Sequence, residues 1–316
     1  MEHEAAQTQP LIQFDHVSKI YDQEKAVQNV SLTIQKGEFF VLVGASGSGK
    51  TTTLKMINRL LTPSQGRIIF QGRDIAALPL KPYRHHVGYV LQTSALFPNM
   101  SVLENAAVTL NAQGIKTKAA RPKIEQLLSE VGLDPNKYAQ RMPHELSGGE
   151  QQRVGIVRAL AAEPEVILMD EPFSALDPIS RQQLQQLVAK LHEKLRTTII
   201  FVTHDMDEAL QLGTRIGVMQ HGLLEQVDTP TDIVLHPKNA QVAAMFKTQQ
   251  APTVSDLIAL GFYQLKDDTS NLPTIKPEST LAELAQAFLN QSEQLVQGND
   301  HMVVTQHDYL RYMAQQ

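Results

Sequence analysis

The segment Gly44–Thr51, which reads GASGSGKT, constrains the fold of this chain more than any other stretch of the sequence. It has the form G-x-x-x-x-G-K-T, in which glycines let backbone N–H groups converge on phosphate oxygens. The five apolar residues Phe39–Val43 before it predict a buried strand, and residues 50–60 after it predict a helix. A strand that runs through such a loop into a helix is typical of α/β phosphate-binding folds.

The loop and its flanks also predict how a nucleoside triphosphate would bind. Lys50 would reach the β- and γ-phosphates, and the hydroxyl of Thr51 would ligate Mg²⁺. A chance glycine- and serine-rich turn is the alternative, and the strand and helix on either side argue against it. The predicted phosphate-binding residues are Gly44, Ala45, Ser46, Gly47, Ser48, Gly49, Lys50, Thr51 and Thr52.

Short apolar runs alternate with helical patterns, which predicts an α/β domain with a mostly parallel sheet. The expected strands are Phe39–Val43, Val87–Leu91, Val166–Met169 and Thr198–Thr203. The expected helices lie at about 50–60, 102–112, 119–131, 149–162, 179–196 and 205–212. Antiparallel strands are expected near Ile12–Phe14, Val30–Ile34 and Arg67–Phe70, and a helical insertion without strands over 100–145, within a subdomain of about 97–155.

Polar residues follow three of the expected strands where each strand ends. Asp170 and Glu171 follow one strand, Gln92 another and His204 a third. Ligands of open α/β sheets bind beyond the carboxyl ends of the strands. There Asp170 would hold Mg²⁺, and Gln92 would offer its amide oxygen to Mg²⁺ or to water. Glu171 would polarise the attacking water, and His204 would donate to the γ-phosphate. Taken singly, the two carboxylates fit a solvated turn equally well, and a strand-end Gln or His is more often a structural residue.

The segment LSGGEQ, residues 146–151, places two glycines in the first turn of an expected helix, although glycine weakens helices. Ser147 and Glu150 form an S-x-x-E capping box around Gly148 and Gly149. The glycines would bare the first N–H groups as a second anion site. We infer that this site closes over a nucleotide held by a second copy of the chain. The alternative is that both glycines only let the backbone pass close to a neighbour.

Composition and charge exclude several classes of function. The chain has no Cys, so it can form neither disulfides nor thiolate metal sites. No apolar run reaches the roughly 18 residues that span a bilayer, and the polar N-terminus is no secretory signal, so we expect a soluble protein that reaches membranes through a partner. Residues 251–316 carry 8 acidic and 3 basic residues, which accounts for the whole net charge of −5. We expect no nucleic-acid partner and no polybasic lipid patch.

These motifs resemble those of the ATP-binding subunits of ABC transporters over residues 11–247. GASGSGKTT (44–52) is similar to the phosphate loop, Gln92 to the Q-loop glutamine, LSGGEQ to the family signature, and VILMDEP (166–172) to the second nucleotide motif. The resemblance makes Glu171 the catalytic carboxylate, His204 the switch histidine and Tyr21 the aromatic on adenine, with Val27 beside it. It identifies the D-loop as Ser174, Ala175, Leu176 and Asp177.

The resemblance also implies the partners. A homodimer of ATPase subunits would dock beneath integral membrane permease subunits, at the cytoplasmic face of the membrane, and a substrate-binding protein would act through the permease. Residues 93–105 resemble the surface that grips the permease. ATP would close the dimer, and hydrolysis would reopen it.

The substrate class rests on a further likeness. GASGSGKTTTLKMINRL and RHHVGYVLQTSALFPNMSVLEN resemble the importers of glycine betaine, carnitine and choline. Residues 251–316, beyond a linker at TQQAPT, resemble one poorly matched CBS module, where such importers usually carry two. A small helical cap or a dimer contact is the alternative for this region. Three alternative functions remain: an importer of another solute such as an amino acid, a soluble ABC-type ATPase, and a regulatory nucleotide binder.

Overall fold

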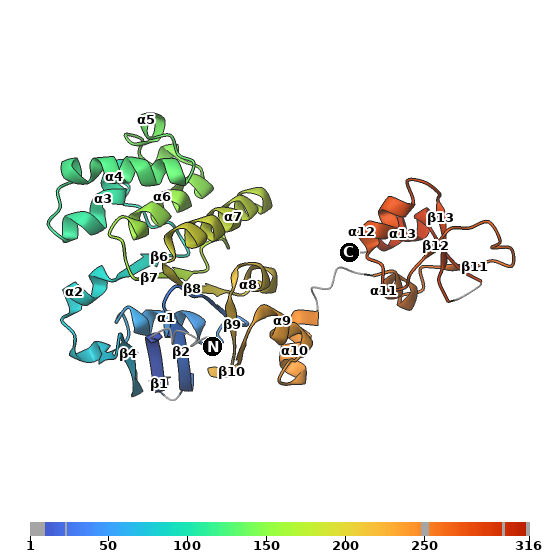
Figure 1. Ribbon diagram of the computed structural model, residues 1–316, viewed down its shortest axis with the longest axis horizontal. Coiled ribbons are helices and arrows are strands. Elements are labelled where there is room, and N and C mark those ends of the chain that lie inside the picture. The colour runs from blue at the N-terminus through green and yellow to red at the C-terminus, as the bar shows by residue number, and fades with distance from the viewer. Residues whose placement is uncertain (1–9, 23, 248–252, 299–300, 314–316) are drawn as a thin grey trace, which may run out of the picture. The chain divides into compact units, whose positions relative to one another are not determined.

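The computed structural model describes residues 10–22, 24–247, 253–298 and 301–313. The chain divides into two compact units, Met1–Met245 and Phe246–Gln316 (Figure 1).

A six-stranded sheet forms the centre of the first unit. Its order is β10-β9-β3-β8-β7-β6, and all neighbours are parallel except β9 and β10. The strands are β3 (Phe39–Val43), β6 (Val87–Val90), β7 (Val166–Asp170), β8 (Thr198–Thr203), β9 (Arg215–Gln220) and β10 (Leu223–Asp228). The predicted α/β class with a mostly parallel sheet is confirmed. The prediction missed β9 and β10.

Helices cover both faces of this sheet, because the side chains of a strand point alternately to opposite sides. On β7, Leu168 faces a core shared with α1 (Lys50–Ile57) and the second sheet. Its neighbour Ile167 packs instead with apolar side chains of α6 (Gly148–Leu160) and α7 (Pro178–Leu195). Helix α8 (Met206–Leu212) contacts β3 and β8. Strands buried on both faces explain the nearly continuous apolar runs.

A four-stranded antiparallel sheet of order β2-β1-β4-β5 packs below α1. Its strands are β1 (Pro10–Tyr21), β2 (Glu24–Gln35), β4 (Gln65–Phe70) and β5 (Arg73–Asp74). The antiparallel pairing was predicted, but β1 and β2 are much longer than the short apolar runs that indicated them. A 3₁₀ turn at Ile75–Ala77 and α2 (Leu80–His85) lead from this sheet to β6.

Residues 100–145 contain no strand in this part of the described chain, as expected, and form a helical region (Figure 1). Helices α3 and α4 pack on each other and on α6. The elements are α3 (Val102–Ala112), α4 (Thr117–Glu130), α5 (Pro135–Tyr138) and a 3₁₀ turn at Pro143–Glu145. After β10 come α9 (Pro230–Leu235) and α10 (Ala240–Lys247), and the first unit ends within α10 at Met245.

The second unit is an α+β fold with its own core. Its sheet has the order β11-β14-β13-β12, and only β12 and β13 are parallel. The elements are α11 (Val254–Ala259), β11 (Gln264–Leu265), β12 (Thr274–Ile275), α12 (Leu281–Ala287), β13 (Glu293–Val296), β14 (Met302–Thr305) and α13 (Gln306–Met313). The sheet rules out a purely helical cap. The predicted linker lies outside the described residues except for Thr253, which caps α11.

Candidate functional site

The loop between β3 and α1 takes a shape that only glycine permits at two positions. Gly49 has φ +101°, in the left-handed region, and a Cβ there would overlap the backbone oxygen of Ala26. A Cβ at Gly44 would overlap the backbone oxygen of Met219. Helix α1 has no side-chain cap. Its first N–H groups are therefore not occupied by a capping side chain, which suits anion binding.

Lys50 lies within this loop and is only 4% exposed. Its Nζ donates to the backbone oxygens of Gly44 at 2.7 Å and Ala45 at 2.9 Å. Burial lowers the pKa of Lys50, while the charges of Glu171 and Asp170 act in the opposite direction. The ammonium group is therefore held by loop carbonyls and lies in the field of two carboxylates.

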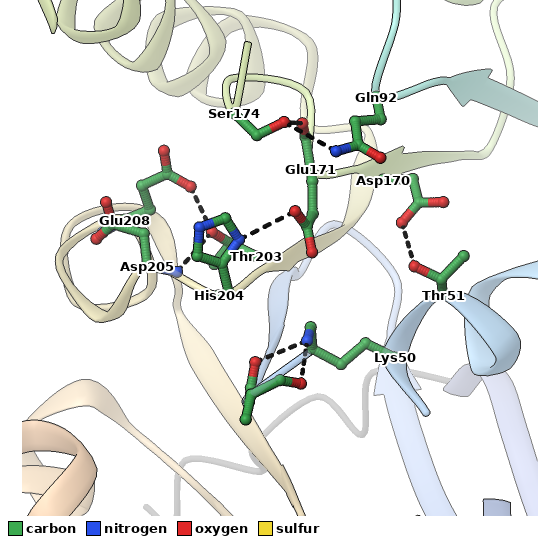
Figure 2. Close-up of polar contacts among 12 residues, drawn as sticks. Lys50, Thr51, Gln92, Asp170, Glu171, Ser174, Thr203, His204, Asp205 and Glu208 are labelled. Atoms are coloured by element: carbon green, nitrogen blue, oxygen red, sulfur yellow. Dashed lines mark hydrogen bonds and ion pairs between the residues drawn. The ribbon is translucent and has the colours of Figure 1, made fainter. Parts of the chain in front are cut away.

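Asp170, at the end of β7, is joined to the phosphate loop. Its Oδ1 accepts from Thr51 Oγ1 at 2.7 Å (Figure 2). Its Oδ2 accepts from the Tyr89 hydroxyl at 3.4 Å. Burial, followed by the charge of Asp170, raises the pKa of Tyr89, so this phenol stays protonated as a donor. The sequence predictions missed Tyr89. Its position two residues before the end of an apolar strand carried no chemical signal.

Glu171 has a left-handed backbone, with φ +44°, which is unusual for a residue with a side chain. Such strain costs about 1–3 kcal/mol and persists only where the surroundings fix it. Here the Glu171 N–H donates to Val202 O at 2.9 Å. The turn thus points the carboxylate toward His204, whose Nδ1 lies 3.0 Å from Glu171 Oε2 (Figure 2).

The contact between Glu171 and His204 fixes the hydrogen of the imidazole. An ionised carboxylate only accepts hydrogen bonds, so Nδ1 of His204 is the donor. Nε2 of a neutral ring is then an acceptor. It can donate to a phosphate only if it carries a hydrogen, either in the imidazolium form or after the hydrogen has moved from Nδ1 to Nε2. The His204 side chain is 57% exposed, so its ring is accessible from solvent.

Gln92 is also brought to this group, through the D-loop. Its Nε2 donates to Ser174 Oγ at 3.2 Å, and Ser174 Oγ donates to Glu171 O at 3.0 Å. Figure 2 shows Gln92, Ser174, Glu171 and His204 around one space above Lys50. Farther along the D-loop, Ala175 is exposed and Leu176 half-buried, and Asp177 caps α7 by accepting from Ser180 N at 3.0 Å.

The predicted capping box at the start of α6 is confirmed. Ser147 Oγ accepts from Glu150 N at 3.3 Å, and Ser147 N donates to Glu150 Oε2 at 2.7 Å. Neither Gly148 nor Gly149 has a positive φ, and a Cβ at either would meet only ordinary contacts, Leu176 at 3.7 Å and Ser180 at 3.5 Å. Close packing within the chain therefore does not explain the glycines, and that alternative is wrong.

In the part of the chain that the structure describes, some of the predicted site residues are not hydrogen-bonded to the group around Glu171. No hydrogen bond among the described residues links 147–150 to the group around Glu171. Tyr21 is 42% exposed at the end of β1, with the Lys19 ammonium 5.1 Å from its ring centre. Val27 is fully buried in the core beside Gly49, so its side chain supports the loop and does not face solvent as Tyr21 does.

This fold and this set of side chains define a P-loop nucleotide-binding protein, and comparison with known proteins gives the family. The ABC transporter family model matches residues 27–174. The glycine betaine uptake system ATP-binding protein YehX of Escherichia coli is 41% identical over 280 residues, covering 88% of this chain and 91% of that protein. The chain therefore belongs to the ABC transporter family, which confirms the predicted family and enzyme class, an ATPase coupled to transport.

Two further matches bear on the site. The glycine betaine/carnitine/choline transport ATP-binding protein OpuCA of Bacillus subtilis is 47% identical over 230 residues, which cover 72% of this chain but 60% of that protein. The dimeric ATP-binding cassette MJ0796, solved in a post-hydrolysis state with ADP and Pi, is 34% identical with a TM-score of 0.62. That match covers 69% of this chain and 98% of MJ0796.

Proposed function

We propose that this chain hydrolyses ATP between two identical copies to energise the import of a quaternary ammonium solute such as glycine betaine, carnitine or choline. In each site Lys50 and the loop 44–52 hold the phosphates, Glu171 polarises the attacking water and His204 contacts the γ-phosphate. Tyr21 stacks on the base. Residues 147–150 of the second copy cover the same triphosphate.

Mg²⁺ fits the oxygen-rich end of β7. Thr51 Oγ1 and Asp170 Oδ1 lie 2.7 Å apart, and Gln92 adds an exposed amide on the same side. Hydroxyl, carboxylate and amide oxygens suit this hard cation. The described residues contain no group of three or more His, Cys, Asp and Glu that could hold a metal, so ATP oxygens would complete the coordination. Bound there, Mg²⁺ would neutralise charge on the transferring phosphoryl group.

The glycine pair at the start of α6 carries the two-copy proposal. Its helix end is capped, open to solvent and bare of side chains, although nothing within the chain requires glycine there. Ile179, beside the D-loop, is 71% exposed, which suits a surface that meets a partner. The dimeric MJ0796 cassette supports the same arrangement.

A groove of about 510 Å³ between α2, β6, α3 and α6 would receive the permease. It exposes mostly apolar surface, with Lys81, Arg84 and Arg158 among its polar residues. Residues 93–105 follow in sequence shortly after β6, which lines the groove. No helix of the described residues is long and apolar enough to cross a membrane. We propose peripheral attachment at the cytoplasmic face through permease subunits, with a substrate-binding protein on the far side of the permease.

The proposed identity of the transported solute rests on the names of the relatives. YehX and OpuCA are named for glycine betaine and for glycine betaine, carnitine and choline. Uptake assays with radiolabelled glycine betaine and an amino acid, in cells with and without this chain, would test it. Loss of amino-acid uptake alone would move the proposal to another solute. For residues 251–316, the single CBS-like module stays a prediction.

Substitution of the proposed catalytic carboxylate tests the two-copy site. Glu171→Gln keeps the size of the side chain but removes the base, so we expect ATP binding to persist and hydrolysis to fall by roughly 100-fold or more. The variant should form a stable dimer with Mg-ATP, measured by light scattering. Lys50→Ala, which loses the phosphate contact, is the matched control and should stay monomeric. A Glu171→Gln chain that binds ATP but never dimerises would contradict the proposal.

A further inference from the structure

We propose that Glu208 is a positioning residue that holds His204 in place through the hydroxyl of Thr203 and ties it to the helix that follows the D-loop. This inference rests on the proposed role of His204. Glu208 lies in the first turn of α8 and is only 5% exposed. Its Oε2 accepts from Thr203 Oγ1 at 2.6 Å (Figure 2).

The hydroxyl of Thr203 secures the peptide on both sides of His204. It donates to Glu208 and also accepts from Asp205 N at 3.0 Å. Both bonds therefore join the residue before the histidine to residues that follow it. Because Glu208 takes the hydroxyl hydrogen, the Thr203 lone pair is left for Asp205 N. Thr203 is 2% exposed, so water does not replace these bonds.

The other oxygen of Glu208 leads to α7. Gln185 Nε2 donates to Glu208 Oε1 at 3.2 Å, and Gln185 is also buried. Helix α7 starts at the D-loop, where Asp177 caps it. Arg181, one turn before Gln185, reaches both ends of the path: Nη2 donates to Leu176 O at 3.4 Å, and Nη1 lies 3.9 Å from Asp205 Oδ2.

The start of α8 does not need the Glu208 side chain as a cap. Asp205 already caps α8 by accepting from Asp207 N at 2.9 Å and Glu208 N at 3.3 Å. Burial opposes the charge of Glu208 and raises its pKa. A buried carboxyl is costly unless it is hydrogen-bonded, and both oxygens of Glu208 accept hydrogen bonds. The bonds present run from α7 to the strand end that carries His204. The position of the D-loop helix is thereby transmitted to the histidine.

The test compares variants that break the path with variants that keep it, in the full-length chain with Mg-ATP. Thr203→Val and Glu208→Met lose the bond at nearly constant volume, and Thr203→Ser and Glu208→Gln retain it. We expect kcat to fall about ten-fold in the first pair, since small displacements of a catalytic group are expensive. KM for ATP should stay within about two-fold, and the conservative pair should match wild type.

Thr305→Val is the matched control for Thr203→Val, because Thr305 Oγ1 is also buried and donates to a buried carboxylate, Asp308 Oδ2, at 2.6 Å. It should leave kcat unchanged. If Thr203→Val or Glu208→Met does not fold, Gln185→Leu carries the same test one bond farther away. Folded variants with wild-type kcat would overturn the inference. His204→Ala separates the two proposals: wild-type kcat in that variant would instead refute the role of His204 itself.

Discussion

Helices α3 and α6 begin with the same hydrogen bonds, but the first turn of α3 faces the core and that of α6 faces solvent. In α3, Ser101 N donates to Glu104 Oε2 at 2.8 Å, and Ser101 Oγ accepts from Glu104 N at 3.3 Å. In α6 the corresponding bonds of Ser147 and Glu150 measure 2.7 and 3.3 Å. The two helices pack on each other and begin alike, so the cap itself does not distinguish them.

The difference lies in the two residues inside each box. Val102 and Leu103 of α3 are buried in the core, whereas Gly148 of α6 is exposed and Gly149 half-buried. A capping box thus fixes where a helix begins, and the residues within it decide whether that end faces the core or solvent. We propose that the glycines of α6 keep this helix end bare for a group that approaches from outside the chain.

Making the two capping boxes alike should have the largest effect on kcat for ATP. Gly148→Val copies Val102 into α6, where its side chain would cover the bare helix end. We expect kcat for ATP to fall roughly 100-fold, because contacts to the phosphate from that end are blocked. The melting temperature should not fall, since valine is a better helix former than glycine.

The reciprocal variant Val102→Gly is the control. It removes a fully buried side chain and should lower the free energy of unfolding by about 3 kcal/mol in denaturant titrations, with kcat per folded molecule unchanged. Full ATPase activity in Gly148→Val would break the comparison, because the glycine would then have no outside partner.

Loss of each serine cap should have an intermediate effect. Ser101→Ala and Ser147→Ala each remove one capping bond, worth about 1 kcal/mol of unfolding free energy. Only Ser147→Ala should also reduce kcat, by about ten-fold, because Ser147 is exposed at the proposed nucleotide surface while Ser101 is buried. Parallel denaturation and ATPase assays measure both quantities. Equal kcat in the two variants would argue that the α6 cap is structural alone.

The smallest effect concerns the box glutamates, whose pKa is lowered in both helices. For Glu104 the causes are the backbone and side-chain hydrogen bonds of Ser101. For Glu150 burial acts to raise the pKa, and hydrogen bonds from Tyr138 and Ser147 outweigh it. A carboxylate with a lowered folded pKa stabilises the fold above its ordinary value of 4.5, and this is lost as the pH falls through the folded value.

Both Glu104→Gln and Glu150→Gln should therefore lower the melting temperature by about 1 °C at pH 7, and by less at pH 4. Thermal unfolding scans at the two pH values measure the difference from wild type. A difference that does not change with pH would show that neither carboxylate charge contributes.

The features that could be predicted are those encoded in short stretches of sequence. The loop at 44–52, the box at 147–150 and the strand ends at Gln92, Asp170 and His204 all follow from local patterns. Strand β9 was missed because Gly217 interrupts its apolar run. That glycine is needed since the Phe40 ring occupies the space of a Cβ.

Contacts between distant segments left no such pattern. Gln185, Thr203 and Glu208 meet only because α7, β8 and α8 pack together, and each residue alone is an ordinary polar residue of a helix or strand. Likewise, the hydroxyl of Tyr89 reaches Asp170 across 81 positions of sequence. The residues that meet around Glu171 were therefore predictable, and the side chains that hold them in place were not.

The phosphate loop is wedged between two backbone carbonyls, Ala26 O from the antiparallel sheet and Met219 O from the parallel one. Its contour is thus imposed by the packing of the two sheets against it, so that docking of a triphosphate would cost little ordering entropy. Changes in cellular ATP would alter how many of these cradles are filled without altering their form. The motion that transport demands must then come from elsewhere in the molecule.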